Sequence, residues 1–249
     1  MSNLKFTNFG KMILVRAYFS IFSMILGLIF IIRTILLMFV PIYSPFYRIL
    51  SGISLAFAII GLVITLLIVI TANQLTLVDN HPFLKKFYSR LLVSFILATV
   101  GLVYPIIHTL IVRWIWYTTT FTEQLGFIIA NIIGLMGIIP VISAWSFFSK
   151  YSTDRRYNPN IAQGSNLIRI GAILSIFSGI FAILDSIFIY FIIFGGIPYN
   201  ILITIILWVI LIGSMLLDII IPILFIIGYF KVGKSIQSVT ISSNIEPTL

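Results

Sequence analysis

The chain alternates between long apolar stretches and short polar connections. Six stretches consist almost entirely of hydrophobic residues, and their apolar positions are continuous rather than alternating. About 20 such residues in a helix cross the roughly 30 Å hydrocarbon layer of a bilayer, whereas a β-barrel strand would alternate. The pattern therefore predicts six transmembrane helices, at residues 17–40, 49–72, 91–112, 125–148, 170–194 and 201–229.

Composition agrees with this pattern. Hydrophobic residues make up 61% of the chain, charged residues 8%, and the mean hydropathy is +1.21, whereas soluble domains carry about a quarter charged residues. We therefore predict an all-α, polytopic membrane helix bundle that forms a single domain over residues 1–234. The polar ending, residues 235–249, is expected to be disordered in the cytoplasm.

The basic residues determine the predicted orientation. With the N-terminus inside, twelve of the fifteen Lys and Arg residues fall on the cytoplasmic side, and only Arg33, Arg48 and Arg113 fall toward the outside. This asymmetry follows the positive-inside rule, so both termini are predicted to be cytoplasmic in a multi-pass protein of the cell membrane. The net charge of +9 is thus interpreted as a topology signal and not as a nucleic-acid surface.

Aromatic residues lie near several predicted boundaries. Trp145, Tyr229 and Phe230 fall at inner ends of apolar stretches. Amphipathic rings favour the headgroup level of a bilayer, so these side chains are expected to form part of an aromatic belt. The alternative is that a chain with 15% aromatic residues places some of them at boundaries by chance.

Three pairs of apolar stretches resemble one another. RAYFSIFSMILGLIF, RLLVSFILATVGLVY and, more loosely, RIGAILSIFSGIFAI open the first stretch of each pair, and a glycine interrupts an Ile/Leu run in the second. The arginines are 74 and 79 residues apart and the glycines 73 and 79 residues apart, so two landmarks move together. We predict three repeated helical hairpins, marked by Arg16, Arg90 and Arg169 and by Gly61, Gly134 and Gly213.

Three ionisable residues fall at one depth if the hairpins are parallel. Arg33, His108 and Asp185 follow the leading arginines by 17, 18 and 16 residues. An ionised side chain in hydrocarbon costs roughly 2.5 to 3.5 kcal/mol on insertion scales, so such groups face the bundle interior and pair. We predict that Asp185 neutralises Arg33, with His108 as a hydrogen-bonding third member, in a structural or gating cluster.

Asp218 has no charged residue at its depth in the sixth apolar stretch. A lone carboxyl group in hydrocarbon is expected to keep its proton. Pro222 lies four residues later and conflicts with the carbonyl of Asp218, which predicts a helix break beside a titratable acid. In transporters such breaks mark ion or proton sites. The simpler alternative is a proline kink in which the protonated acid forms hydrogen bonds with the freed backbone groups.

Few residues remain for chemistry. There is no cysteine, two histidines only, and no metalloprotease, phosphate-loop or dinucleotide motif. A polar group at Asn73, Asp79, Asn80 and His81 offers ligands, but a short polar turn before Pro82 is the favoured explanation. We therefore expect no enzymatic activity, no catalytic residue, no cofactor and no metal site.

Two segments carry a family resemblance. The isoleucine-rich, cysteine-free composition, the loop RRYNPNIAQGSNLIRIGAIL from Arg155 and the ending IIGYFKVGKSIQ from Ile226 resemble a family of multi-spanning membrane proteins from thermoacidophilic archaea. The likeness covers mostly the last third of the chain. That family has no assigned activity, so the resemblance implies an archaeal membrane setting and no site residues.

Two functions lead from the sequence, and a lipid-acting enzyme is a third, less favoured alternative. The first is a non-catalytic integral membrane protein that acts as an accessory or scaffold component of a membrane assembly. The second is a small secondary transporter or proton-coupled permease in which Asp218 titrates and Asp185 with Arg33 gates the outer side. The expected partners are membrane lipids and other membrane subunits or further copies of the chain, and no nucleic acid.

Overall fold

Six long helices build the protein. The computed structural model describes residues 2–37, 45–115, 120–194 and 201–243, and within these ranges it contains helices and connecting turns but no strand. This confirms the predicted all-α bundle of six helices long and apolar enough to cross a membrane. They are α1 (Ser2–Leu37), α2 (Pro45–Thr76), α3 (Pro82–Ile115), α4 (Thr120–Asp154), α5 (Pro159–Phe194) and α6 (Ile201–Ser243).

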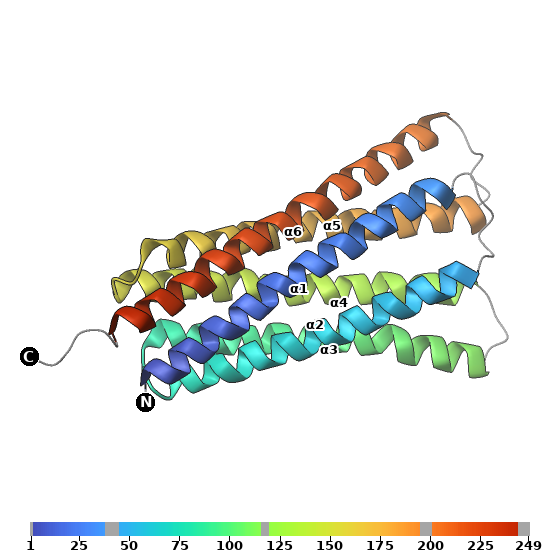
Figure 1. The fold of residues 1–249 in the computed structure, drawn as a ribbon. Coiled ribbons are helices and arrows are strands. Elements are labelled where there is room, and N and C mark those ends of the chain that lie inside the picture. The colour runs from blue at the N-terminus through green and yellow to red at the C-terminus, as the bar shows by residue number, and fades with distance from the viewer. Residues whose placement is uncertain (1, 38–44, 116–119, 195–200, 244–249) are drawn as a thin grey trace, which may run out of the picture.

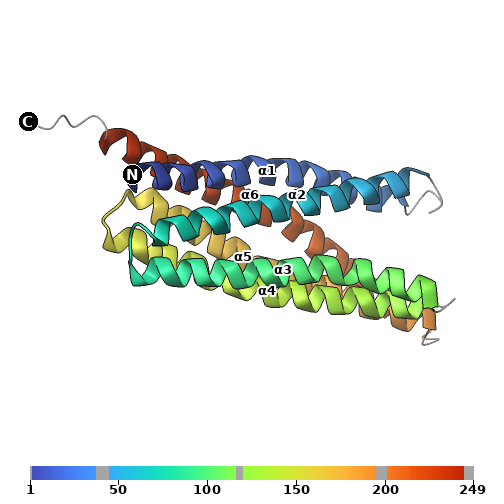
Figure 2. The same cartoon turned by 90° about the horizontal axis from the view of Figure 1, so that it is seen from below.

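The helices form a ring in chain order. Each helix packs against its two neighbours in sequence, and α6 closes the ring against α1. Helix α1 packs more extensively against α6 than against α2, its partner in the predicted first hairpin, and α2 also packs sparsely against α3. Both termini and the α2–α3 and α4–α5 turns lie at one end of the bundle, toward which the helices converge (Figure 1). Figure 2 shows α1 and α2 on one side and α3 and α4 on the other.

The helices are longer than the apolar stretches predicted. They contain 32 to 43 residues, which at 1.5 Å per residue is about 48 to 65 Å, well beyond the roughly 30 Å of hydrocarbon. The extra length shortens the turns that join them. The connection that the predicted apolar stretches leave between residues 148 and 170 is reduced to residues 155–158, because α5 begins at Pro159, where the Asn158 side chain accepts a hydrogen bond from the Asn160 N–H at 3.0 Å.

Residues 235–243 of the polar ending belong to helix α6, which continues to Ser243. Ser235 and Ile236 are buried, and Ile236 lies against Gly10 of α1. The tail is helical there because it has a packing partner that its polar composition does not reveal.

The tightest core lies where the basic residues gather. We call this part of the bundle the basic end, and it comprises residues 4–17, 68–92, 144–169 and 228–238. Phe9 of α1 meets Phe87 of α3 and Phe148 of α4, with ring centroids 5.9 and 5.5 Å apart, so side chains fill the ring from wall to wall. The buried aromatic residues are Phe9, Phe87, Trp145, Phe148, Tyr151 and Tyr229, and all of them belong to the basic end.

Two of these aromatics correct the predicted belt. Trp145 is 2% exposed and Tyr229 8% exposed, and their rings lie 5.7 Å apart. They join α4 to α6 inside the core rather than facing headgroups. Trp145 lies three residues before the end of its predicted apolar stretch and Tyr229 is the last residue of its own, but both helices continue beyond that point and surround these side chains with protein.

Glycines set two close helix crossings at the basic end. A β-carbon on Gly164 of α5 would lie 2.7 Å from the carbonyl oxygen of Gly228 in α6, so the backbones touch there. Gly10 and Gly233 play the same role between α1 and α6, because a β-carbon on either would lie 3.2 to 3.4 Å from the other's carbonyl oxygen. Small residues thus hold α6 against both of its neighbours.

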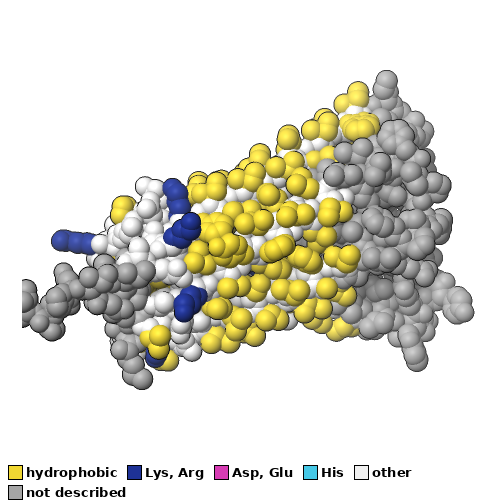
Figure 3. Space-filling model, viewed as in Figure 1, with side chains coloured by type: hydrophobic (Ala, Val, Ile, Leu, Met, Phe, Trp, Pro, Cys, Tyr) yellow, Lys and Arg dark blue, Asp and Glu magenta, His cyan; other side chains and the backbone are white. Residues whose placement is uncertain are grey.

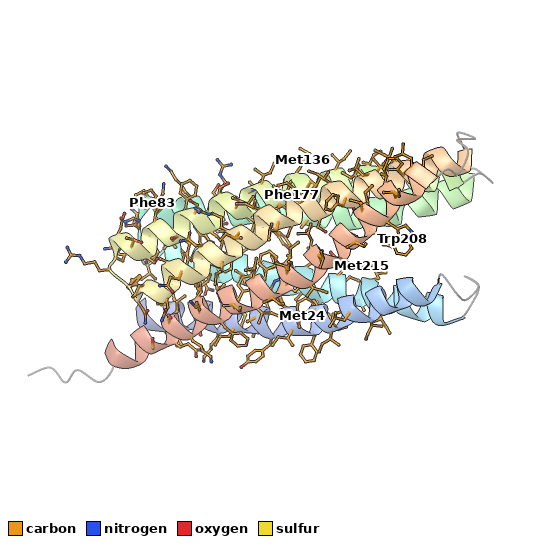
Figure 4. The ribbon with its side chains drawn as sticks, turned by 90° about the horizontal axis from the view of Figure 1, so that it is seen from above. Met24, Phe83, Met136, Phe177, Trp208 and Met215 are labelled. Carbon is orange, nitrogen blue, oxygen red and sulfur yellow. The ribbon has the colours of Figure 1, made fainter. Side chains whose placement is uncertain are left out.

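Beyond the basic end, large apolar side chains point outward. We call residues 18–29, 55–67, 93–104, 128–143, 170–184 and 205–227 the apolar middle. Met136 of α4 and Phe177 of α5 point away from the bundle and are 54% and 52% exposed (Figure 4). On the face drawn in Figure 3, hydrophobic side chains cover this region and Lys and Arg side chains border it. Such a surface is stable in lipid, so the protein is an integral, multi-pass membrane protein.

Candidate functional site

The side chains of the predicted cluster, Arg33, His108 and Asp185, lie outside the described part of the protein. Its backbone belongs to α1, α3 and α5, which are alternate members of the ring. Within the described residues, none of these three helices packs directly against another of them. A contact among the three side chains would have to cross the ring, and the cluster stays a prediction.

Asp218 has a partner on the neighbouring helix. The Ser178 hydroxyl of α5 donates a hydrogen bond to the Asp218 carboxyl group of α6 at 3.3 Å. Helix α6 is continuous from Ile201 to Ser243, so Pro222 does not divide it into two helices. Asp218 thus forms a polar link between α5 and α6, which is the packing role that membrane-buried polar side chains commonly have.

A second polar group joins the two turns at the basic end. We call it the loop clasp, and it consists of Asp79, His81, Tyr151, Asp154 and Arg155. The Asp79 carboxylate accepts hydrogen bonds from the Tyr151 hydroxyl at 2.9 Å and from Arg155 Nε at 3.0 Å, and Arg155 Nη2 contacts its second oxygen. The guanidinium thus binds the carboxylate through two parallel bonds. Tyr151 is 2% exposed, so Asp79 satisfies a hydroxyl group in the core.

His81 adds a weaker tie between the same turns. Its Nδ1 accepts a hydrogen bond from the Phe83 N–H at 3.3 Å at the start of α3, which leaves Nε2 to carry the proton of the neutral ring. Nε2 lies 3.8 Å from Asp154 at the end of α4. The imidazole also packs edge-on against Tyr151, with ring centroids 5.2 Å apart.

The loop clasp has a structural role, because it joins the α2–α3 turn to the α4–α5 turn. The hydrogen bond from Arg155 to Asp79 raises the pKa of the guanidinium, so the cation persists at every usable pH. Among the described side chains, no three His, Asp or Glu residues come close enough to hold a metal ion. The sequence offered Asp79 and His81 as a polar turn, but Arg155 is 76 residues away in the chain, and nothing in its spacing identified it as their partner.

A groove lies between α1, α2 and α3. Its volume is about 440 Å³, and most of its wall is apolar. Arg16 lies in this groove and donates a hydrogen bond from Nη1 to the Gly61 carbonyl oxygen of α2 at 3.3 Å. The lining residues are Arg16, Phe19, Ser23, Leu26, Gly27, Phe57, Ala58, Gly61, Leu62, Thr65 and Ala98.

The sequence marks Arg16 as a topology charge and as the first residue of a repeat, but not as part of a groove. Two signals could have distinguished it. It opens the first repeat, and the carbonyl it contacts is that of Gly61, the landmark glycine of the same hairpin. The three landmark glycines have different surroundings. A β-carbon on Gly61 would lie 3.2 Å from Phe19 and one on Gly213 would lie 3.0 Å from Phe181, whereas one on Gly134 would meet open space.

Comparison with known proteins identifies no relative. No model of a protein family matches the chain, and neither a curated protein nor a solved structure does so. Nothing in these comparisons bears on the resemblance to archaeal membrane proteins, which stays a prediction.

Proposed function

We propose that this protein is a non-catalytic accessory or scaffold component of a membrane assembly, with its basic end in the cytoplasm of the cell. The observation that carries the proposal is that the described acidic side chains are all engaged in contacts within the protein. The structure describes three carboxyl side chains, and each of them faces a partner on a neighbouring helix or turn: Asp79 with Tyr151 and Arg155, Asp154 with His81, and Asp218 with Ser178.

These contacts support a rigid element rather than a moving one. Alternating access requires helices that separate or rotate around a central site. Here the basic end is filled by interlocked aromatic rings and tied across its two turns by the loop clasp. The large apolar surface of the middle then serves lipid or neighbouring membrane subunits.

The permease hypothesis has less support. It needs a water-lined route to a titratable acid near mid-membrane. Asp218 is not among the residues that line the groove, and its carboxyl group is hydrogen-bonded to Ser178. Arg16, the cation in the groove, contacts α2, whereas Asp218 belongs to α6, the other neighbour of α1 in the ring.

A two-part experiment tests the proposal. The size of the protein in gently solubilised membranes of its source is compared with that of the purified 28.1 kDa chain. The purified protein and Asp218→Asn are also reconstituted in vesicles that contain a pH-sensitive dye, and proton flux is driven by a potassium diffusion potential. A native size above that of the purified protein, with flux no greater than in protein-free vesicles, supports an accessory role.

Proton flux in the wild type that Asp218→Asn abolishes would overturn the proposal and establish the permease. Equal sizes before and after purification would also contradict an accessory role. Ser178→Ala is the matched control, since it removes the hydrogen bond to Asp218 and leaves the acid in place. It should not change flux under either hypothesis if Asp218 alone carries protons.

A further inference from the structure

We infer that the groove between α1, α2 and α3 binds an anionic membrane lipid, with the lipid phosphate at Arg16 and one acyl chain along the apolar wall. This site is independent of the scaffold role, because a lipid can occupy the groove whether or not the protein belongs to an assembly.

The first argument is the uncompensated charge of Arg16. Its described contacts are a hydrogen bond to a neutral carbonyl, that of Gly61, and the face of the Phe19 ring 5.6 Å away. The three carboxyl groups that the structure describes all have other partners, so none of them neutralises this cation. A guanidinium offers five N–H donors in a planar fork that matches phosphate geometry, and most of that capacity is left for a ligand.

The second argument is the position of Arg16 along the helix. It is the deepest basic residue at the start of α1, following Lys5 and Lys11, and lies 14 residues beyond Ser2. At 1.5 Å per residue that is about 21 Å from the start of the helix. Helix α1 continues from there into the apolar middle, so Arg16 sits where basic and apolar surfaces meet. Basic pockets between transmembrane helices at that level are the sites that bind acidic lipid headgroups.

The third argument is the shape and lining of the groove. It runs from Arg16 to Gly27 along α1, a rise of roughly 16 Å. Its volume of about 440 Å³ falls within the range of about 300–1,000 Å³ typical of ligand sites. Leu26, Phe57 and Leu62 provide an apolar wall suited to a hydrocarbon chain, while Ser23 and Thr65 are the polar side chains beside it.

The sparse packing of α2 explains why the groove exists. Around the ring, each helix from α3 to α6 packs extensively against the next, and α6 packs extensively against α1. Helix α2 contacts its neighbours α1 and α3 less. Gly27 adds to the space, because a β-carbon there would have no atom within 4 Å. A lipid chain in this position would fill the volume that protein side chains leave between α1 and α2.

Lipid binding to the full-length protein tests the site. The protein is held in a neutral detergent, and binding of phosphatidylglycerol, phosphatidylcholine and glycerol phosphate is measured separately by native mass spectrometry. We expect saturable binding of phosphatidylglycerol, weaker binding of phosphatidylcholine, and none of glycerol phosphate, which has the headgroup charge but no chain. Arg16→Gln should weaken phosphatidylglycerol binding at least about tenfold, as the loss of a charge-assisted hydrogen bond requires.

Two further variants separate this site from general attraction to basic residues. Arg90→Gln makes the same charge change at the matching position of the second repeat, on an exposed side chain outside the groove, and should leave binding within twofold of wild type. Gly27→Leu adds side-chain volume to the groove from a position where a β-carbon meets no atom within 4 Å, and it keeps Arg16, so it should weaken binding as Arg16→Gln does. Equal losses in Arg90→Gln and Arg16→Gln, or unchanged binding in Gly27→Leu, would overturn the site.

Discussion

The basic end and the apolar middle of the same six helices are packed in different ways. At the basic end, aromatic side chains from α1, α3, α4 and α6 meet across the ring and are fully enclosed. In the middle, Met136 points outward with 54% of its surface exposed (Figure 4), and Trp208 is 48% exposed. The helices run through both regions, so the difference does not arise from secondary structure.

The solvent explains the difference. Apolar side chains gain free energy when they leave water, and the basic end, where charged side chains gather, encloses its apolar side chains in a core. In the middle, lipid tails are as apolar as leucine, so burial brings no comparable gain and helices are held by close backbone packing and polar links. One chain therefore follows soluble-protein rules at one end and membrane rules beyond it.

Gly228→Ala should cause the largest loss, because it strikes the basic end where backbones touch. The new β-carbon would lie 2.6 Å from the Ile168 side chain and 2.9 Å from the Gly164 carbonyl oxygen, which cannot move aside without shifting α5. We expect the free energy of unfolding to fall by about 3 kcal/mol. Unfolding in mixed micelles titrated with sodium dodecyl sulfate measures it.

The matched control for Gly228→Ala is Gly134→Ala in the apolar middle. A β-carbon at Gly134 meets open space, so the change should be neutral or slightly stabilising, since alanine favours helices by up to about 1 kcal/mol over glycine. Equal losses in the two variants would show that the two regions are packed alike.

Asp79→Ala should have the next largest effect, through the loop clasp. It leaves the buried Tyr151 hydroxyl without its acceptor, which costs about 2 kcal/mol. Asp79→Asn keeps an acceptor oxygen and should cost less. The same micelle titration in a Tyr151→Phe background should show a smaller loss for Asp79→Ala, and additive losses would rule out the hydrogen bond as the cause.

Ser178→Ala tests a polar link in the middle. Interhelical hydrogen bonds in membranes contribute about 0.6 kcal/mol on average, so removing the donor to Asp218 should lower the free energy of unfolding by about that amount. Asp218→Asn and the double variant complete the cycle. A coupling energy near zero would mean that the hydroxyl and the carboxyl group do not act as a pair.

Arg155→Gln should produce the smallest effect. Arg155 is exposed at the rim of the basic end, so solvent screens its pairing with Asp79. The loss should be smaller than that of Asp79→Ala and should vanish in about 1 M salt, where the screening length is about 3 Å. A loss that persists in salt would show that Arg155 acts by packing and not by charge.

The fold class followed from the sequence, but the arrangement of the helices did not. Continuous apolar stretches predicted six helices, and the structure contains six. The hairpin prediction did not anticipate that α1 packs best against α6, nor that the end of α6 is a buried helix around Ile236. Those contacts depend on Gly10 and Gly233, two glycines in segments that the hydropathy pattern had placed outside the spans.

The candidate sites also differ in how far the sequence alone could identify them. Asp218 was identified because a carboxyl group in an apolar run is conspicuous in any sequence. The contacts of Arg16 and Arg155 cannot be predicted from the sequence, because their partners are Gly61, 45 residues away, and Asp79, 76 residues away. Charge is visible residue by residue, whereas a groove or a clasp exists only where separate helices meet.

Hydropathy by itself determined the solvent, the helix count and the class of protein, since each depends on local composition. Tertiary structure decided which helices touch, where the ring is filled and where it leaves a groove. The physical reason is that helices surrounded by lipid are apolar on every side, so no hydrophobic stripe encodes which face turns inward. That choice is made by small residues, aromatic interlocking and a few polar links, and these become evident only in three dimensions.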